Sequence, residues 1–336
     1  MWGDVLGCEE IGIFDNFFAL GGHSLSAVKL ITRIQNRFEV KIPLSALFSA
    51  QTIAGMADFI RHAIDHDVWT PLVPMQPAGD KPPLFCVHTG FGLVLVFVEL
   101  MRRLEADRPF YGIQAVGLEE GQQPVQSMEA MADLYIRQIR RVQPAGPYHL
   151  MGHCFGGLVA YAMAQRLREQ GEEVAFLGMM DTLNTNEVVR SLEGMISVET
   201  MFYDVLLGNL SKRVKKRFRK LSAQEQAEMV YDRIKDDAKD IGFELPDIDV
   251  GMVRRVLDLL QINTKVALNY RIEPYPGKIT YFVAQDEKRD QPIVTGWPEM
   301  ASEGIDIIEV PGDHYGMLMP PHVGELAQAI ARQLDE

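Results

Sequence analysis

A cysteine set between glycines is the residue of this chain that most clearly suggests chemistry. Cys154 stands in Gly152-His153-Cys154-Phe155-Gly156, after an apolar run typical of a buried strand and before a stretch expected to be helical. This is the setting of the G-x-S-x-G nucleophile elbow, with cysteine in the place of serine. Because a lone buried cysteine is more often structural, the assignment depends on an acid and a base that can act with it.

An acid and a base follow Cys154 in the order used by α/β-hydrolases, which is nucleophile, acid, base. Asp181 ends an apolar run, and His314 lies in a Gly-Asp-His loop after the last predicted strand. We therefore expect Cys154, Asp181 and His314 to form a triad. Asp286, which closes a later predicted strand, is the alternative acid.

Two backbone N–H groups are candidates for an oxyanion hole. We assign one to Gly90, in the loop after the first clear strand, and the other to Phe155, directly after the nucleophile. His153 occupies the variable position of the elbow and is expected to point away from the nucleophile. Asp313 is expected to hydrogen-bond within its own loop, and Cys86 to be inert core.

A serine near the N-terminus is the second candidate for chemistry. Ser24 follows Gly21 and Gly22, which permit a tight turn, and stands where a helix should begin. A serine there is ordinarily only a helix cap. A phosphate ester at this place would face free backbone N–H groups and the positive end of the helix dipole. Ser26 should point to a different face, and His23 should be a surface residue beside the site.

Four segments of different character position these residues. Residues 1–68 predict a small α-helical bundle, and the proline-rich segment 69–83 predicts an extended linker. From 84 to 336 apolar runs alternate with helical ones, which predicts a mostly parallel sheet covered on both faces. The alternation stops over about 185–270, where we expect a helical lid above the carboxyl edge of the sheet.

The predicted elements follow from hydrophobic periodicity. Strands are expected at 84–88, 110–115, 148–152, 174–180, 278–284 and 305–310. Helices are expected at 24–38, 43–48, 52–64, 92–104, 128–142 and 158–170, and in the lid at 198–207, 223–238 and 250–269. The basic run 212–220 is interpreted as a solvated helix face, with docking of the acidic helical bundle as the alternative.

Composition restricts the classes of function. A formal charge of −13 argues against nucleic-acid binding, which needs a basic surface. The sequence shows neither an apolar run long enough to span a membrane nor a signal peptide. Three scattered cysteines fit a reducing cytoplasm and predict neither disulfides nor a metal site.

The run from Asp15 to Leu25 resembles the attachment site of the peptidyl carrier proteins of nonribosomal peptide synthetases. In that family a phenylalanine-rich segment, two glycines, a His or Asp and a serine precede a helix, as Phe17, Phe18 and His23-Ser24 do here. The resemblance extends over residues 1–68. It implies that Ser24 carries covalently attached 4′-phosphopantetheine.

Residues 83–336 resemble the type I thioesterase domain of the same synthetases. The match lies in the His-x-x-x-Gly loop at His88, the elbow at Cys154, the acid at Asp181, the helical lid and His314. Family thioesterases usually carry serine, and cysteine is a minority variant. The sequence is compatible with a natural cysteine and with an engineered Ser→Cys change that traps an acyl-enzyme.

Together the two resemblances imply the terminal part of a synthetase. The carrier would hold an acyl or peptidyl thioester, and the thioesterase would release it through an acyl-Cys154 intermediate by cyclisation, transesterification or hydrolysis. The implied partners are upstream condensation and adenylation domains and a phosphopantetheinyl transferase. The alternatives are a noncatalytic scaffold that docks the carrier and a plain esterase with a helical appendage.

Overall fold

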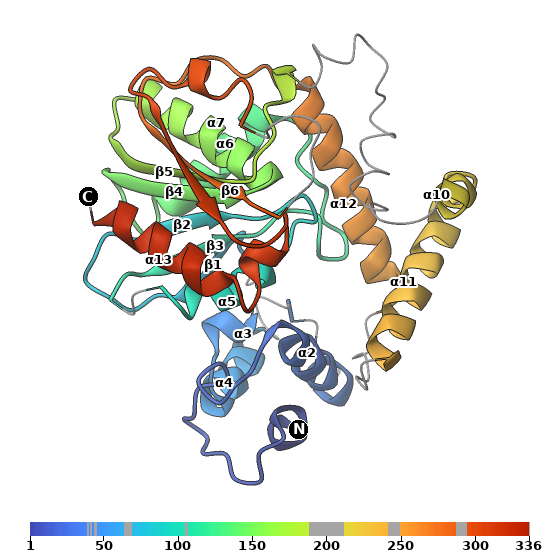
Figure 1. The fold of residues 1–336 in the computed structure, drawn as a ribbon. Helices are drawn as coiled ribbons and strands as arrows, with labels where there is room; N and C mark the ends of the chain where they lie inside the picture. The colour runs from blue at the N-terminus through green and yellow to red at the C-terminus, as the bar shows by residue number, and fades with distance from the viewer. Residues whose placement is uncertain are drawn as a thin grey trace.

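The computed structural model describes residues 1–38, 40, 42–43, 46–63, 69–104, 107–187, 212–240, 249–286 and 294–335. Within these ranges the chain forms a small helical unit below a larger α/β unit, from which a helical hairpin projects (Figure 1). The lid helix predicted at 198–207 lies outside the described residues. The arrangement confirms the predicted fold class, a helical bundle followed by a mostly parallel sheet with a helical insertion.

The N-terminal unit contains four described helices. They are α1 (Trp2–Leu6), α2 (Ser24–Phe38), α3 (Ala46–Ser49) and α4 (Ile53–Ala63). Aromatic side chains form the centre of the unit, because Trp2 meets Phe17 edge-on at 5.4 Å and Phe18 stacks on Phe48 at 4.9 Å. Such contacts stabilise a bundle too small for a large aliphatic core.

The larger unit is built on a seven-stranded sheet with the order β1-β3-β2-β4-β5-β6-β7. All neighbouring strands are parallel except β1 and β3, which are antiparallel. The strands are β1 (Leu72–Gln76), β2 (Leu84–Val87), β3 (Phe110–Ile113), β4 (Tyr148–His153), β5 (Val174–Met180), β6 (Ile279–Ala284) and β7 (Ile305–Val310). All six predicted strands are present.

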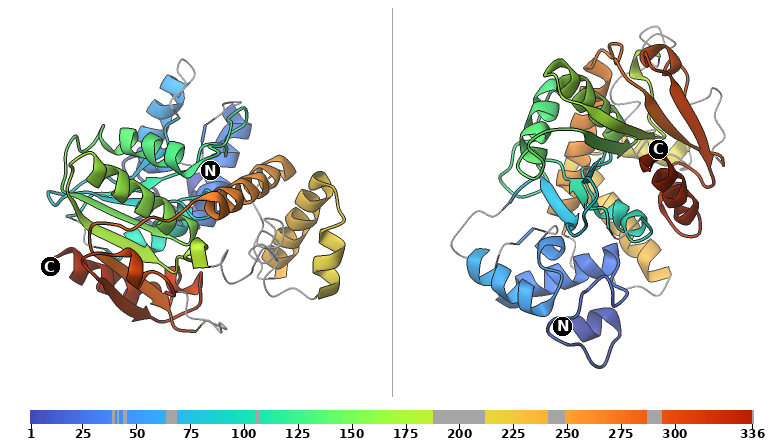
Figure 2. Two further views of the ribbon diagram at one scale, coloured as in Figure 1. Left: turned by 90° about the horizontal axis from the view of Figure 1, so that it is seen from above. Right: turned by 90° about the vertical axis from the view of Figure 1, so that its left-hand side faces the viewer.

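Helices cover both faces of the sheet (Figure 2). One face packs against α6 (Met128–Ile139) and α7 (Phe155–Glu169), which share one apolar cluster with the central strands. The other face packs against α5 (Val98–Met101) and α13 (Val323–Leu334). The predicted helix at 92–104 is shorter than expected, since a 3₁₀ turn, η1 (Leu95–Phe97), precedes α5. Two further 3₁₀ turns, η2 (Pro298–Met300) and η3 (Gly316–Leu318), lie between the last elements.

The predicted linker contains a strand that belongs to the sheet. Strand β1 lies inside 69–83 and pairs with β3, with an irregularity in register between Pro74 and Gln76. Proline cannot donate to a ladder, but an edge strand bonds on one side only and tolerates it. The proline-rich segment is therefore partly an edge strand rather than a free connector.

The helical unit is packed against this edge of the sheet. Gln51 Nε2 donates to the Met75 carbonyl at 3.0 Å, and α3 lies against β1. One apolar cluster runs from the helical unit through β1 to α5 and α13. The two units therefore share a buried interface in this arrangement.

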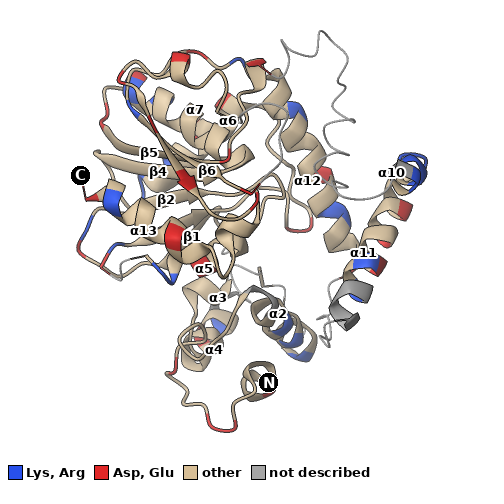
Figure 3. Ribbon diagram, viewed as in Figure 1, with Lys and Arg blue, Asp and Glu red and all other residues tan. Residues whose placement is uncertain are grey.

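The described part of the insertion projects from the sheet and contains three helices, of which α11 and α12 pack side by side. It consists of α10 (Lys212–Phe218), α11 (Ala223–Asp240) and α12 (Val250–Asn269). In Figure 3 the basic helix α10 lies at the end of α11 that is remote from α2, α3 and α4. This arrangement does not bring the basic run to the carrier-like helices. Within the described ranges, no helix is both long and apolar enough to cross a membrane.

Candidate active site

The turn from β4 to α7 holds Cys154 in a strained backbone conformation. Its φ of 57° and ψ of −120° lie in a region that residues with a side chain rarely adopt. The Cys154 N–H donates to the Met180 carbonyl at 2.8 Å, and Gly157 N–H donates to the Cys154 carbonyl at 3.2 Å. The thiol is partly exposed, so it can meet a ligand.

Two glycines are required by how closely the backbone approaches itself at this turn. A Cβ on Gly152 would lie 2.2 Å from the Gly156 carbonyl carbon, and one on Gly156 would lie 2.3 Å from the His88 carbonyl oxygen. Any side chain would push α7 away from the sheet. These contacts explain why the sequence motif has glycine on both sides of the cysteine.

The partly exposed His314 and the buried Asp181 form a pair at the carboxyl edge of the sheet. His314 Nδ1 lies 2.7 Å from Asp181 Oδ2, although the two residues are 133 positions apart. The other oxygen, Oδ1, accepts from the Ala284 N–H at 3.1 Å, and the Asp181 N–H donates to the Phe282 carbonyl at 2.9 Å. The carboxylate is therefore fixed by its neighbouring strand and orients the imidazole.

The surroundings of His314 favour its protonated form. Burial lowers the pKa of His314, but the charge of Cys154, hydrogen bonds to Asp181 and Cys154, and the charge of Asp181 all raise it. The balance raises the pKa of His314 from 6.5 to about 10. The imidazole therefore retains a proton at neutral pH in contact with both predicted triad partners.

The alternative candidates occupy supporting positions. Asp286 accepts the Gly312 N–H at 2.9 Å, and Asp313 accepts the Gly316 N–H at 2.7 Å, so both carboxylates bind the backbone of the loop that carries His314. His153 is fully buried, and its Nε2 lies 2.6 Å from the His314 carbonyl oxygen. These three side chains hold the loop, whereas Asp181 contacts the imidazole.

The loop after β2 brings Gly90 beside Phe155 and Cys154. All three line one pocket, and a Cβ on Gly90 would lie 3.9 Å from that of Phe155. Asn263 on α12 donates from Nδ2 to the Gly90 carbonyl at 2.9 Å, which anchors the loop to the lid. Both predicted oxyanion residues therefore line the same pocket as Cys154.

His88 supports this loop from beneath. Its ring is fully buried, with Nδ1 2.7 Å from the Thr89 carbonyl and Nε2 2.8 Å from the Tyr135 hydroxyl. Burial lowers the pKa of His88 to about 4, with a smaller opposing effect from the Thr89 hydrogen bond. The ring is therefore neutral, and His88 is a structural support of the loop.

A pocket of about 510 Å³, part of it open to solvent, lies beside Cys154. Helix α12 supplies one wall of this pocket. Besides Cys154, Gly90, Phe155 and the residues of α12, the lining residues are Leu158, Leu183, Thr185 and Tyr315. The residues that α12 contributes are Leu260, Asn263, Thr264 and Ala267. The insertion thus forms one side of the site, as expected of a lid.

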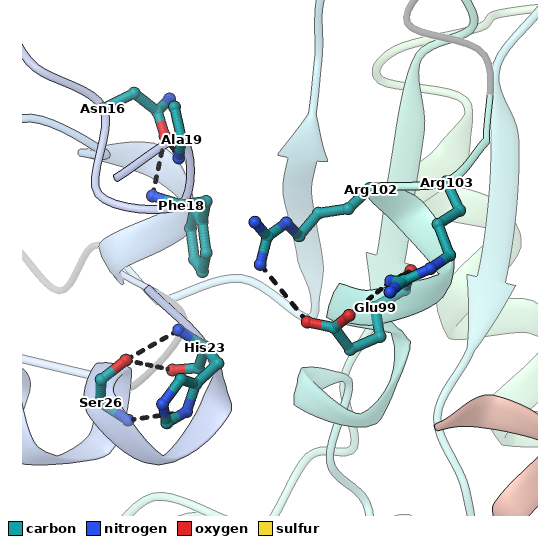
Figure 4. Close-up of polar contacts among 8 residues, drawn as sticks. All are labelled: Asn16, Phe18, Ala19, His23, Ser26, Glu99, Arg102 and Arg103. Atoms are coloured by element: carbon teal, nitrogen blue, oxygen red, sulfur yellow. Dashed lines mark hydrogen bonds and ion pairs between the residues drawn. The ribbon is translucent and has the colours of Figure 1, made fainter. Parts of the chain in front are cut away.

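The start of α2 is held by a reciprocal pair of hydrogen bonds (Figure 4). The His23 N–H donates to Ser26 Oγ at 2.7 Å, and this hydroxyl donates to the His23 carbonyl at 2.8 Å. Ser26 is buried and His23 is exposed. The side chain of Ser24, at the first helical position, lies outside what the structure describes.

The two glycines before α2 are required for different reasons, Gly22 by close packing and Gly21 by its backbone conformation. A Cβ on Gly22 would lie 2.3 Å from a ring carbon of Phe17, and Gly21 has a φ of 94°. Asn16 then fixes the loop, because its Oδ1 accepts from the Phe18 N–H at 2.9 Å and its Nδ2 donates to Gln51 at 2.6 Å. Figure 4 shows the guanidinium of Arg102, the residue that follows α5, directed towards this loop.

Several supporting residues were not found from the sequence. Tyr281 and Trp297 both donate to the Thr182 carbonyl at 2.7 Å, which secures the chain directly after Asp181. Asn263 anchors Gly90 from the lid. Of these residues, only Asn263 could have been suspected from the sequence, because its amide lies on a mostly apolar face of a predicted helix. Its partner could not, since it depends on how α12 packs on the sheet.

Comparison with known families is consistent with this geometry. Residues 82–334 match the thioesterase domain family, and residues 1–60 match the phosphopantetheine attachment site family. The chain belongs to the thioesterase domain family, preceded by a phosphopantetheine-binding carrier domain. It is a carrier–thioesterase didomain of the nonribosomal peptide synthetase type.

Curated relatives align with nearly the whole chain. The chain is 30% identical over 335 residues to the dimodular nonribosomal peptide synthase of Bacillus subtilis, and 30% identical over 339 residues to the malpibaldin synthetase of Mortierella alpina. Each alignment covers 99% of this chain, but only 14% and 6% of those proteins, respectively. The chain thus spans a small part of the length of the curated relatives it matches.

Solved structures share the architecture. A four-domain nonribosomal peptide synthetase bound to AMP and glycine matches 98% of this chain with a TM-score of 0.67 and 27% identity, over 25% of its own length. The NocB thioesterase domain, in a covalent complex with a fluorophosphonate nocardicin G analogue, matches 79% of this chain and all of its own. Its TM-score is 0.56 at 23% identity, which shows a common fold.

Proposed function

We propose that this chain releases an acyl or peptidyl group from its own carrier domain through a covalent intermediate on Cys154. The proposed carrier spans residues 1–68, the connector 69–83 and the hydrolase 84–336. The observation that carries the proposal is the contact of His314 with Asp181 at 2.7 Å beside a cysteine on a strand-to-helix elbow. Nucleophile, base and acid then have the roles of a triad.

Ser24 is proposed as the attachment site of 4′-phosphopantetheine. Helix α2 begins at this residue and has no acidic side chain in its first turn, so nothing there repels a phosphate. The hydroxyl of Ser26 is engaged with His23 and buried, which argues against it as the acceptor. When bound, the group supplies a thiol that holds the acyl chain as a thioester.

The proposed first step is attack by the Cys154 sulfur on the thioester carbonyl. His314 holds the proton of the pair, since its pKa is raised to about 10, and leaves sulfur as the nucleophile. The N–H groups of Gly90 and Phe155 hold the tetrahedral oxyanion. Collapse forms the acyl-S-Cys154 bond and breaks the incoming thioester, and His314 gives its proton to the departing thiolate.

The second step is proposed to use the same imidazole as a base. His314 takes a proton from water, an alcohol or an amine, which attacks the acyl-S-Cys154 carbonyl and restores the free cysteine. Because the first step exchanges one thioester for another, little free energy is lost. We infer that the thiol suits cyclisation or transesterification as well as hydrolysis.

Covalent labelling of Cys154 tests the proposal in the full chain. A small acyl thioester of N-acetylcysteamine should add its acyl mass at Cys154, as detected by intact-mass and peptide mass spectrometry. The Cys154→Ala variant should remain unlabelled, and the Asp286→Asn variant should be labelled. Absence of mass gain in the parent chain would favour the noncatalytic docking scaffold.

Loading of the carrier is tested separately. Coenzyme A and a phosphopantetheinyl transferase should add the phosphopantetheine mass at Ser24, and a loaded peptidyl group should then move to Cys154.

Replacing Cys154 by Ser tests the thiol itself. An unchanged rate and product distribution would show that sulfur has no special role. The upstream condensation and adenylation domains of a synthetase are the proposed sources of the loaded chain.

A further inference from the structure

Two buried polar atoms belong to residues that line the mostly apolar pocket beside Cys154. Asn263 and Thr185 are only 1% and 2% exposed. Neither Asn263 Oδ1 nor Thr185 Oγ1 has a hydrogen-bond partner in the part of the chain that the structure describes, although both residues face the pocket. Because buried polar atoms nearly always have partners, such atoms on the wall of a ligand pocket indicate groups of the ligand.

The neighbouring backbone fixes the chemical role of Asn263. Its Nδ2 donates to the Gly90 carbonyl at 2.9 Å, and a carbonyl can only accept. The amide nitrogen must therefore face Gly90, which leaves Oδ1 as a hydrogen-bond acceptor. The Thr185 hydroxyl can donate its proton.

Thr264 provides a contrast on the same wall. Its hydroxyl already donates to the Leu260 carbonyl at 2.7 Å, within its own helix. A polar side chain of this pocket can therefore satisfy its donor locally. Asn263 Oδ1 and Thr185 Oγ1 are left for another partner.

We propose that Asn263 and Thr185 select acyl groups that carry a peptide group next to the thioester carbonyl. A peptide group has one N–H donor and one carbonyl acceptor, which complement Asn263 Oδ1 and the Thr185 hydroxyl, respectively. The pocket would then distinguish a peptidyl chain from a plain fatty acyl chain. This inference depends on the proposed acylation of Cys154 and assigns two residues that recognise the acyl group.

A pair of probes that differ in one group tests the role of Asn263. The N-acetylcysteamine thioesters of N-acetyl-alanine and O-acetyl-lactate differ only in an amide N–H replaced by an ester oxygen. The rate of Cys154 acylation in the full chain is followed by intact mass. The amide probe should react about tenfold faster, because the ester cannot donate to Oδ1. Equal rates would overturn the inference, whereas no labelling by either probe would overturn the proposed function beneath it.

The Asn263→Leu variant should bring the ratio of the two rates close to one. Loss of the bond to Gly90 should also slow both reactions, but this effect cancels in the ratio since both probes carry the same thioester. A ratio that stays near the parent value would overturn the role of Asn263.

Thr185→Val provides an independent variant that removes one unpartnered hydroxyl and keeps the shape. We expect about a tenfold loss of rate for both probes relative to a butanoyl thioester, which has no peptide carbonyl to accept from the hydroxyl. Thr280→Val, a buried threonine on β6 outside the pocket, is the matched control and should leave the relative rates unchanged. If Thr185→Val reacted with each of the three probes at the rate of the parent chain, this result would contradict the assignment.

Discussion

The two sites of this chain are built in opposite ways. The carrier site lies on one continuous stretch, in which Asn16, Gly22 and the His23–Ser26 pair shape the start of a single helix. The hydrolase site brings together an elbow, a strand end and a distant loop, with 133 positions between His314 and Asp181. A residue that another enzyme modifies needs a defined, accessible loop. A residue that performs catalysis needs convergence of distant segments and burial of its partners.

The change with the largest expected effect should remove the function of the carrier site and leave the hydrolase site intact. Ser24→Ala should abolish mass gain from coenzyme A and a phosphopantetheinyl transferase, because no hydroxyl remains to accept the group. Acylation of Cys154 by a soluble thioester should proceed at the parent rate, as followed by intact mass. A large loss of Cys154 acylation in this variant would show that the two sites are not independent.

Within the hydrolase site, the two candidate acids should differ sharply. Asp181→Asn should lower the rate of Cys154 acylation by roughly 10²–10⁴-fold, since the imidazole loses its orienting charge. Asp286→Asn should have a far smaller effect, because an amide oxygen can still accept the Gly312 N–H. Initial rates with one thioester probe compare the two variants. The reverse order of effects would transfer the role of acid to Asp286.

The titration of His314 tests whether the hydrolase site brings distant segments together, because Cys154 and Asp181 both raise the pKa of this imidazole. Its imidazole NMR signals should titrate near pH 10, and the midpoint should fall in Cys154→Ala, since both the charge and the hydrogen bond of Cys154 raise the pKa. A midpoint that does not move in the variant would contradict the contact between Cys154 and His314.

The same shift predicts the sign of the pH dependence of stability. Folding raises the pKa of His314 from about 6.5 to about 10, so the folded state holds this proton more tightly. The contribution of His314 is fully present below about pH 6.5 and is lost as the pH rises through about 10. Urea unfolding across this range should show this decline, and His314→Gln should remove its part of it.

The smallest expected effect lies in the carrier. Ser26→Ala removes the hydroxyl that bonds both backbone groups of His23, and should lower the free energy of unfolding of the helical unit by about 1 kcal/mol. Loading at Ser24 should persist. Thermal unfolding and the coenzyme A mass assay measure the two outcomes. Complete loss of loading would show that Ser26 takes part in the modification itself.

The sequence predicted most of the fold because the spacing of its apolar residues changes clearly between helical and strand segments. Helix α2 has the predicted bounds, Ser24–Phe38, and strand β5 has those of the predicted 174–180. Strand β1 was missed because Pro74 interrupts its pattern, and an edge strand accepts proline that a central strand would not. Helix α1 was missed because five residues are too short to show a period.

The candidate site could be predicted only where chain order constrains it. An elbow, an acid at a strand end and a late histidine follow one another in a fixed order, so Cys154, Asp181 and His314 could be named in advance. The contacts of Asn263 with Gly90 and of His153 with the His314 carbonyl depend on how distant segments are packed. Residue spacing carries no information on such contacts.

The antiparallel strand β1 has a consequence for anyone who isolates the catalytic domain. The family match begins at residue 82, after β1, so a fragment cut there would expose the unpaired N–H and carbonyl groups of β3. It would also uncover the apolar surface that the carrier helices shield. Bare sheet edges join to one another, so such a fragment should self-associate. A fragment that begins before Leu72 keeps β3 paired and should self-associate less.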